Sequence, residues 1–293
     1  MSYEEFKWAL LDQVKGCIED NVTVRLHQVP KNNGNLLDGI SIVSGDKRFS
    51  PVMYIAPYYQ KYLSGEDMEE LARELVCRSR EAMEDVSLSF EGRPALSEIR
   101  QAIYVKVVNH HLNASFLEKL PSVAVLDLTL IFYYQVELGG RKDATILIKN
   151  EDMAQWQLSV DDLLRLAMNN TVKDKPYTFT SLSDIMSAQP EFEEEAVTQS
   201  PLYVLTNHEK LYGAVAVFYP DILKDIARQL GDDLFILPSS VHEVIVLPAK
   251  MAPEKAFLRE LVHEVNQNEV AEDEVLSDNI YYFSREDGEL RIC

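Results

Sequence analysis

The stretch that decides the fold is LYVLTNHEKLYGAVAVFYPDILKDIARQLGDDLFILPSSVHEVIVLP, residues 202–248. Four runs in it are rich in β-branched and aromatic residues and are predicted as strands: Leu202–Thr206, Gly213–Tyr219, Leu234–Leu237 and Glu243–Leu247. Between the second and third runs, Ile222, Ile226 and Leu230 recur at the spacing of one helical face, and Gly231 follows as a natural helix cap. Short connections favour antiparallel strand pairs with the helix packed on one sheet face.

The N-terminal region predicts a similar combination of a helix and paired strands. Phe6, Leu10 and Val14 lie on one face of an amphipathic helix. Residues 22–29 and 36–43 then flank the turn sequence KNNGN, whose asparagines and glycine are typical of a tight reversal. We therefore expect a hairpin in which each strand has one apolar face directed at the helix.

The C-terminal region continues the pattern. An amphipathic helix is predicted over residues 253–265, with Phe257 on its core-facing side. Two short runs, 280–283 and 289–292, form a predicted strand pair around an Asp-Gly turn. The whole chain is therefore predicted to be α+β, with antiparallel sheets and amphipathic helices packed on one face.

The chain of 293 residues is predicted to form two associated parts, 1–120 and 121–293. Residues 97–112 suit a helix by the spacing of their isoleucines and a strand by the run IYVKVV, so both alternatives stay open. Residues 171–200 hold few apolar side chains and are expected to form a long surface connection with one short helix at 183–187.

The charge balance restricts the class of partner. Lys and Arg together number 28 against 48 Asp and Glu, which leaves a net charge of −20. Clustered cations are needed to hold a phosphate backbone, so this composition opposes nucleic-acid binding. It favours a well-solvated acidic surface and, if there is a partner, a basic protein. The oligomeric state cannot be read from the sequence.

Cysteine content and hydropathy favour a cytoplasmic protein. The three cysteines, Cys17, Cys77 and Cys293, are far apart and odd in number, which predicts free thiols and a reducing compartment. Acidic residues interrupt the N-terminal sequence from Glu4 onward, so no signal peptide is expected there. The most apolar run, 123–136, contains Asp127 and is shorter than a membrane span.

Several segments carry a resemblance to known families. The most specific are YVLTN, LYGA and LPSSVHEVI, supported by DATILIKNEDMAQW, LLRLAMNNT and NIYYFSREDGELRI. Over most of its length the chain resembles an uncharacterised bacterial family, of unknown function, from Gram-positive anaerobes. From Asp127 onward it is more weakly similar to another uncharacterised, bacillus-type family. Both resemblances imply an α+β fold and a bacterial cytosolic origin, and neither brings a catalytic residue.

The sequence contains no familiar cofactor or metal motif. It lacks a Gly-rich dinucleotide or phosphate loop, a G-x-S-x-G elbow and an HExxH helix. His–Glu dipeptides occur at His208, His242 and His263, but adjacent residues on a strand or helix point in different directions and cannot bind one ion together. We therefore predict no cofactor and no metal site.

The best local candidate for chemistry is the bend between the last two strands of the central stretch, with Ser239, Ser240, His242 and Glu243. Serine and histidine there could serve as nucleophile and base, or bind a small anion. The competing interpretation is a hairpin turn whose hydroxyls bond to nearby backbone, and we favour it because no third member of a triad is evident. Asn207 and His208, at the end of the first strand, are expected near the same sheet edge.

A second candidate is a group of tyrosines in and after a predicted third N-terminal strand at residues 51–56: Tyr54, Tyr58, Tyr59 and Tyr62. Tyrosine is enriched at protein interfaces, so this strip is a candidate for partner binding. The alternative is that the rings cover the N-terminal core and keep their hydroxyls in water.

Three functional hypotheses follow. The first is a non-catalytic cytosolic binding or adaptor protein, whose partner is a basic protein. The second is a small hydrolase or metal-assisted enzyme that uses the loops at 207–209 and 239–243. The third is a structural homo-oligomer. The acidic composition and the missing catalytic motifs favour the first.

Overall fold

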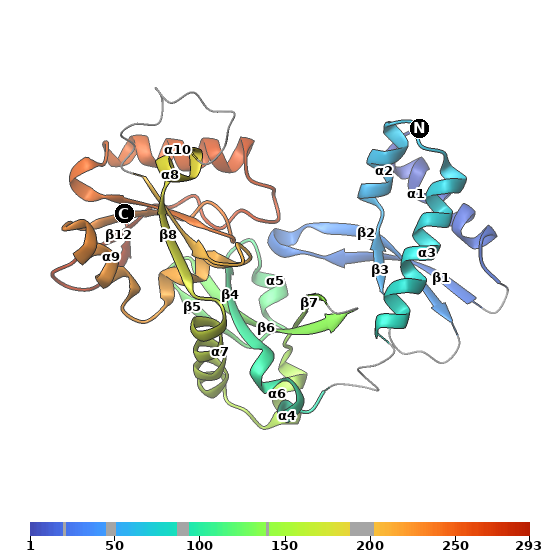
Figure 1. Ribbon diagram of the computed structural model, residues 1–293, viewed down its shortest axis with the longest axis horizontal. Helices are drawn as coiled ribbons and strands as arrows, with labels where there is room; N and C mark the ends of the chain where they lie inside the picture. The colour runs from blue at the N-terminus through green and yellow to red at the C-terminus, as the bar shows by residue number, and fades with distance from the viewer. Residues whose placement is uncertain (20–21, 45–50, 87–93, 139–140, 188–201) are drawn as a thin grey trace. The chain divides into compact units, whose positions relative to one another are not determined.

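The computed structural model describes residues 1–19, 22–44, 51–86, 94–138, 141–187 and 202–293 (Figure 1). The chain divides into two compact units: Met1–Ala95 with Val136–Ala144, and Leu96–Gln135 with Thr145–Cys293. Helices and antiparallel sheets make up the structure, so the predicted α+β class is confirmed. The sequence-based division placed residues 96–120 in the first part, whereas these residues belong to the second compact unit. The division into two associated parts, 1–120 and 121–293, stays a prediction.

Among its described residues, the first unit contains one three-stranded sheet and three α-helices. Its sheet has the order β1-β2-β3 and its elements are, in chain order, α1 (Tyr3–Gly16), β1 (Val22–Pro30), β2 (Leu36–Ser44), β3 (Val52–Tyr54), α2 (Ala56–Leu63) and α3 (Met68–Val86). β1 pairs antiparallel with β2 from Val22–Ser44 to Pro30–Leu36, as predicted. Asn33 and Gly34 adopt positive φ in the turn, which explains why the sequence there is KNNGN.

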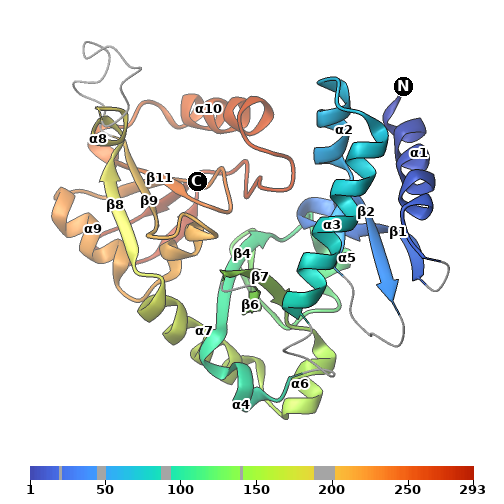
Figure 2. The same ribbon diagram turned by 45° about the vertical axis from the view of Figure 1, so that its right-hand side comes forward.

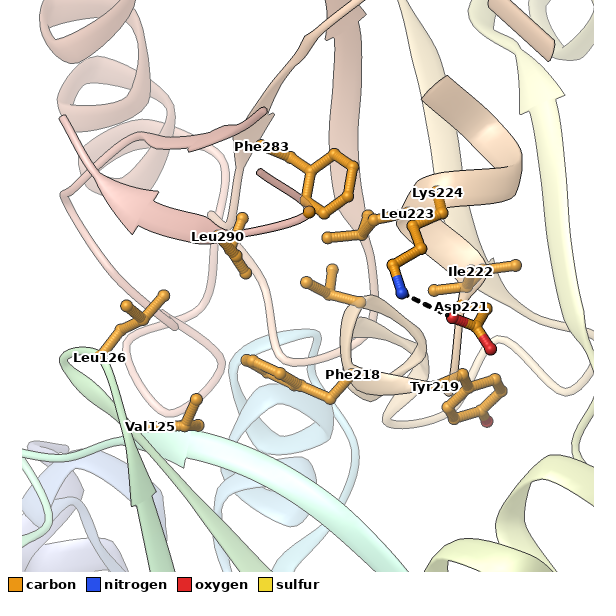
Figure 3. Close-up of a pocket in the computed structure, with 12 residues that line it drawn as sticks. Val125, Leu126, Phe218, Tyr219, Asp221, Ile222, Leu223, Lys224, Phe283 and Leu290 are labelled. Atoms are coloured by element: carbon orange, nitrogen blue, oxygen red, sulfur yellow. Dashed lines mark hydrogen bonds and ion pairs between the residues drawn. The ribbon is translucent and has the colours of Figure 1, made fainter. Parts of the chain in front are cut away.

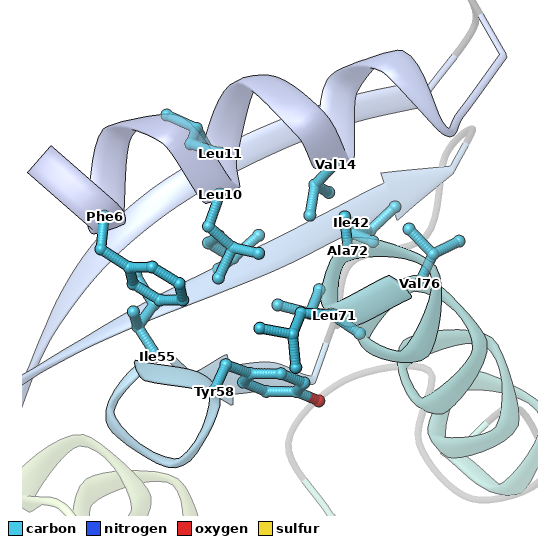
Figure 4. Packing of buried hydrophobic residues seen from close by; sticks show 12 residues of the cluster. Phe6, Leu10, Leu11, Val14, Ile42, Ile55, Tyr58, Leu71, Ala72 and Val76 are labelled. Carbon is cyan, nitrogen blue, oxygen red and sulfur yellow. The ribbon is translucent and has the colours of Figure 1, made fainter. Parts of the chain in front are cut away.

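The core of the first unit lies between α1, α3 and the sheet. Phe6, Leu10 and Val14 are fully buried on the predicted face of α1 and pack in one cluster with Leu71 and Leu75 of α3 (Figure 4). A cation also lies at the edge of this core. The ammonium of Lys7 is 3.0 Å from Asp38 and 2.8 Å from Glu4. The hydrogen bond to Glu4 raises the pKa of Lys7 despite its burial, so Lys7 stays charged.

In the part of the second unit that the structure describes, the strands form two sheets. The four-stranded sheet has the order β4-β6-β5, with β7 also paired to β6, and consists of β4 (Ile103–Asn109), β5 (Ser122–Val125), β6 (Leu128–Leu138) and β7 (Arg141–Leu147). The end of β6 from Val136 and the start of β7 up to Ala144 belong to the first compact unit. The six-stranded sheet has the order β13-β12-β10-β11-β9-β8. Its strands are β8 (Tyr177–Ser181), β9 (Tyr203–Asn207), β10 (Leu234–Leu237), β11 (Val244–Pro248), β12 (Tyr281–Phe283) and β13 (Leu290–Ile292).

Helices of the second unit cover these sheets. They are α4 (Leu96–Ile99), α5 (Ala114–Leu117), α6 (Asn150–Trp156), α7 (Val160–Asp174), α8 (Leu182–Ser187), α9 (Ile222–Leu230) and α10 (Lys255–Asn268). Figures 1 and 2 show α10 along one side of the six-stranded sheet, where Leu258 and Val262 pack against Phe235 and Leu247. The prediction for α10 is wrong in one detail. Phe257, expected in the core, is 56% exposed.

The structure confirms all but one of the elements predicted for residues 202–248. β9, α9, β10 and β11 form where the sequence predicted them, and Gly231 ends α9 with φ +70°. The predicted strand over Gly213–Tyr219 is wrong, because residues Gly213–Phe218 form a 3₁₀ helix, η4. Its first five residues are buried, and a short continuous apolar run does not distinguish a buried strand from a buried helix.

Two further expectations are settled by the structure. The ambiguous region 97–112 contains a short helix and then strand β4, so the strand alternative holds for Ile103–Asn109. The short helix predicted at 183–187 is confirmed as α8. The residues before it, expected as part of a surface connection, instead contain the end of α7 and strand β8. The remainder of that predicted connection, 188–201, lies outside the described residues. β8 was missed because its five residues lie in a stretch with few apolar side chains, although the alternating aromatic and threonine residues of YTFTS are typical of a strand.

The three cysteines are free, as predicted. Within the described ranges, no helix combines the length and the apolar character that a membrane crossing needs.

Asp127, in the two-residue turn between β5 and β6, joins the two sheets of the second unit. Its carboxylate accepts hydrogen bonds from Ser277 (2.5 Å), Asn279 (2.9 Å) and Tyr281 (2.6 Å), which lead into and begin β12. Burial alone would raise the pKa of Asp127, but the three hydrogen bonds outweigh it and hold the pKa below its ordinary value. The ionised carboxylate therefore stabilises the folded second unit.

Replacing Asp127 by asparagine should lower the free energy of unfolding at neutral pH by about 2–4 kcal/mol, because an amide cannot accept three charge-assisted hydrogen bonds. Because the folded-state pKa is depressed, this stabilisation is present above the unfolded-state pKa and is lost as pH falls through the folded-state value. In urea unfolding, the difference between wild type and Asp127→Asn should shrink on acidification. The exposed Asp225→Asn is the control, and equal stability of wild type and Asp127→Asn at neutral pH would contradict this role.

Candidate functional site

The bend at residues 238–243 joins the antiparallel strands β10 and β11, but it is more than a hairpin turn. The segment 274–277 pairs with it along the backbone. Val241 donates its N–H to the carbonyl of Glu274 at 2.9 Å, and Leu276 donates to the carbonyl of Ser239 at 2.9 Å. A bridge between Ser240 and Val275 continues this pairing. The bend is therefore held by a chain segment that the sequence analysis did not connect with it.

Both ring nitrogens of His242 have partners. Nδ1 accepts the backbone N–H of Tyr212 at 3.2 Å, and Nε2 lies 3.3 Å from the carboxylate of Glu274. A nitrogen that accepts an N–H carries no proton, so in the neutral ring the proton is on Nε2 and points at Glu274. The imidazole also stacks on the Tyr212 ring, with centroids 5.6 Å apart. In this arrangement His242 holds a loop and has no free nitrogen to act as a general base.

The other predicted residues of the bend do not complete a nucleophile and base pair. Ser240 is 9% exposed, and its Oγ accepts the backbone N–H of His242 at 3.1 Å instead of contacting the ring. Ser239 is partly buried and Glu243 is exposed. This geometry is typical of a serine that stabilises a turn.

Asn207 and His242 fix the loop 207–212 from two sides. The amide of Asn207 donates to the carbonyl of Leu211 at 2.8 Å and accepts its N–H at 3.3 Å. Thr206, one residue earlier, donates its hydroxyl to the carbonyl of His242 at 2.7 Å. The structure thus brings Asn207 and the bend to the same loop, whereas His208 is exposed.

The glycine of the LYGA motif allows this close approach. A Cβ on Gly213 would lie 2.1 Å from the hydroxyl of Thr206 and 2.6 Å from the carbonyl oxygen of His242. No larger residue fits without moving backbone. The LYGA segment therefore requires its glycine, because η4 packs directly on β9 and the bend.

A buried cluster of tyrosines and a lysine lies beside the loop, and the sequence analysis missed it. Lys175 is 1% exposed, pairs with Glu209, and has its ammonium 4.7 Å from the centroid of the Tyr104 ring. Tyr219 donates its hydroxyl to the carbonyl of Lys175 at 2.9 Å. These residues come from separate parts of the chain, and the only local signal was tyrosine inside otherwise apolar strands.

Tyr133 of β6 has the least complete hydrogen bonding in this cluster. Its ring packs against Tyr104 and Tyr212, and its buried hydroxyl has no hydrogen-bond partner. Burial raises the pKa of Tyr133 and that of Tyr104, the latter to about 12. These hydroxyls therefore stay protonated at neutral pH and can donate a hydrogen bond but cannot act as bases. Among the described residues, no group of three or more His, Cys, Asp or Glu is placed to hold a metal ion.

Comparison with known proteins gives a family and no activity. A model described as a family of unknown function, DUF5688, matches residues 3–285. The chain belongs to this family. No curated protein and no solved structure matched it. The resemblance to a family of unknown function is therefore confirmed, and the matched range includes the YVLTN, LYGA and LPSSVHEVI segments of this DUF5688 protein.

The predicted tyrosine strip of this DUF5688 protein lies on the first unit. Tyr58 is 5% exposed and belongs to the core (Figure 4). Tyr59 and Tyr62 each pack against Phe6, with ring centroids 5.1 and 5.2 Å away, and Tyr54 lies under the ammonium of Lys31. The rings therefore cover the core, as in the alternative interpretation, and a contact strip made of the partly exposed Tyr54, Tyr59 and Tyr62 stays a prediction.

Gly213→Ala should destabilise the protein by about 3 kcal/mol or more, because the new methyl group overlaps backbone atoms that cannot move independently. Chemical denaturation measures the loss. The control is Gly16→Ala at the end of α1, where nothing lies within 4 Å of the added carbon and stability should not fall. Equal effects of the two substitutions would show that the close approach at Gly213 is not needed.

Two tyrosine substitutions provide a matched comparison in the second unit, where each side chain is 1% exposed. Tyr133→Phe removes a hydroxyl without a partner, so stability should be unchanged or higher. Tyr281→Phe removes the donor to Asp127 and should cost about 1–3 kcal/mol. Thermal unfolding of both variants tests this. A large loss from Tyr133→Phe would reveal a hydrogen-bond partner, such as a bound molecule, for that hydroxyl.

Proposed function

We propose that this DUF5688 protein is a non-catalytic cytosolic binding protein that binds a basic protein through the exposed face of α10. The observation that carries the proposal is the position of Phe257. Its ring is 56% exposed, although the leucine that follows it is buried in the core. Aromatic side chains of this kind serve as anchors in protein interfaces.

Acidic side chains follow this anchor along α10 and in the segment after the helix. Glu260 and Glu264 are exposed and follow Phe257 at the i+3 and i+7 spacing of one helical face. From Glu260 to Asp278 the sequence contains no Lys or Arg, and its acidic residues are Glu260, Glu264, Glu269, Glu272, Asp273, Glu274 and Asp278. Negative charge near a helix C-terminus is unfavourable for the helix dipole, so helix stability does not explain this distribution.

The cations near the start of α10 are directed at the rest of the unit. The ammonium of Lys255 lies 5.8 Å from the ring centroids of both Phe235 and Tyr282. The guanidinium of Arg259 donates to the carbonyl of the terminal residue, Cys293. The face around Phe257 is therefore suited to a basic amphipathic segment, whose apolar side chains would cover the ring while its cations pair with the glutamates.

The hydrolase alternative has weaker support. It requires a histidine with a free ring nitrogen beside a nucleophile, whereas both nitrogens of His242 have partners and Ser240 bonds to backbone. A cytosolic location and a Gram-positive source belong to this proposal as expectations from the sequence. A structural homo-oligomer is kept as an outcome of the test below.

A photo-crosslinking amino acid at position 257 tests the proposal in native cytosol. We expect crosslinked peptides that are rich in Lys and Arg, and their yield should fall with added salt because screening weakens attraction between unlike charges. The double variant Glu260→Lys, Glu264→Lys should abolish the crosslinks. A purified partner should then bind the wild type directly, and more slowly at high salt.

Two controls make the result specific. The crosslinker at Tyr177, a 45% exposed residue on β8, should not capture the same peptides. The variant Glu70→Lys, Glu118→Lys changes the net charge equally at exposed positions outside α10 and should keep the crosslinks. Crosslinks to a second copy of the chain, or capture that survives charge reversal on α10, would contradict the proposed partner.

A further inference from the structure

A cavity of about 300 Å³ lies in the second unit among four elements. The β5–β6 turn, η4, the start of α9 and the β12–β13 hairpin each contribute to its wall. Most of the lining is apolar. Figure 3 shows the side chains of Val125, Phe218 and Leu290 around the cavity, with Lys224 turned toward Asp221. This lining suits an apolar chain better than water or a polar metabolite.

A second, polar cavity of about 540 Å³ shares Lys224 with the first. Three cations contribute to its wall: Lys224, Arg228 and Arg285. In a chain with 28 basic against 48 acidic residues, three cations at one cavity are a marked local concentration. Asp233 and Glu286 also line it, so the site is not uniformly positive. The apolar wall of the first cavity and the charged wall of the second therefore meet at a single side chain, Lys224.

The ion pairs of Lys224 and Arg228 can be broken at a low cost in free energy. Lys224 pairs with Asp221 at 2.9 Å and Arg228 pairs with Asp225 at 2.8 Å, and all four side chains are more than half exposed. Exposed pairs of this kind contribute about 0–1 kcal/mol each. An incoming anion that is partly desolvated by the apolar cavity can therefore replace Asp221 as the partner of Lys224.

The backbone of the cavity wall is strained at two positions. Leu126 has φ +57° and Asp221 has φ +60°. Leu126 is the first residue of a two-residue hairpin turn, a position where glycine or asparagine is preferred. Despite this cost it is a leucine, 39% exposed, on the cavity wall. A large apolar side chain at a strained position is consistent with a role in binding, because folding alone does not require it there.

We propose that these adjoining cavities bind an amphiphilic anion, with an apolar chain in the first cavity and a carboxylate or phosphate head group at Lys224. The inference is independent of the function proposed for α10, so charge reversal at Glu260 and Glu264 should leave this binding unchanged.

Isothermal titration of the full chain with four probes that share one apolar tail tests this site. Octanoate and octyl phosphate should bind, whereas octanol and octylamine should bind at least about tenfold more weakly, because only the anions pair with Lys224. The tighter of the two anions identifies the head group. Failure of both anions to bind, or equal affinity for octanol, would overturn the proposal.

Two variants separate the parts of the site. Lys224→Gln should weaken octanoate about tenfold or more and leave octanol unchanged, whereas the exposed control Lys173→Gln should alter neither. Leu126→Gly should weaken every probe that binds without lowering the melting temperature, because glycine relieves the positive φ. Unchanged octanoate affinity in Lys224→Gln would contradict the site, and unchanged affinity in Leu126→Gly would show that this leucine takes no part in binding. Loss of stability in Leu126→Gly without loss of affinity would assign that leucine a structural role and overturn its part in binding.

Discussion

The hydrogen bonds accepted by Asp127 are the interaction on which the second unit depends. They fix the β5–β6 turn to Ser277, Asn279 and Tyr281, and so tie the four-stranded sheet to the entry of β12. The segment that ends at Ser277 is also the segment that pairs with the bend 238–241. Glu274, which holds the ring of His242, lies in it as well. One partly buried carboxylate therefore positions, through successive backbone pairings, the region that the sequence had marked for chemistry.

Because of these contacts, the serine and histidine of the bend are explained as structural residues. A catalytic histidine needs one ring nitrogen free for the substrate or nucleophile, and an orienting carboxylate on the other. His242 has the carboxylate, but its second nitrogen holds the N–H of Tyr212. The same loop is fixed again by Asn207 and packed beneath by Gly213. Polar residues here stabilise a junction between β9, η4 and β11, which accounts for their presence without a reaction.

Local patterns predicted most elements because each one has its own signal, such as the α9 stripe that ends at Gly231 or the KNNGN turn. Features that depend on distant partners could not be predicted. The run after Gly213 is equally apolar as strand or helix, and only the contact with Thr206 and His242 decides between them. In the sequence, Glu274 and Asp127 do not differ from other acidic residues, because their partners are distant in the chain. Phe257 matched the core period, but the helix turns it outward.

Stability and binding meet at the β5–β6 turn. Strained backbone persists only where neighbouring interactions determine the conformation more strongly than the residue itself does. Asp127 provides these neighbouring interactions. It directly follows Leu126 in the chain, and three hydrogen-bond donors hold its carboxylate in place. The strain at Leu126 in turn places an apolar side chain on the cavity wall, opposite the helix that carries Lys224. The interaction that joins the two sheets thus also makes possible an apolar surface beside a cation, which is the combination that an amphiphilic anion requires.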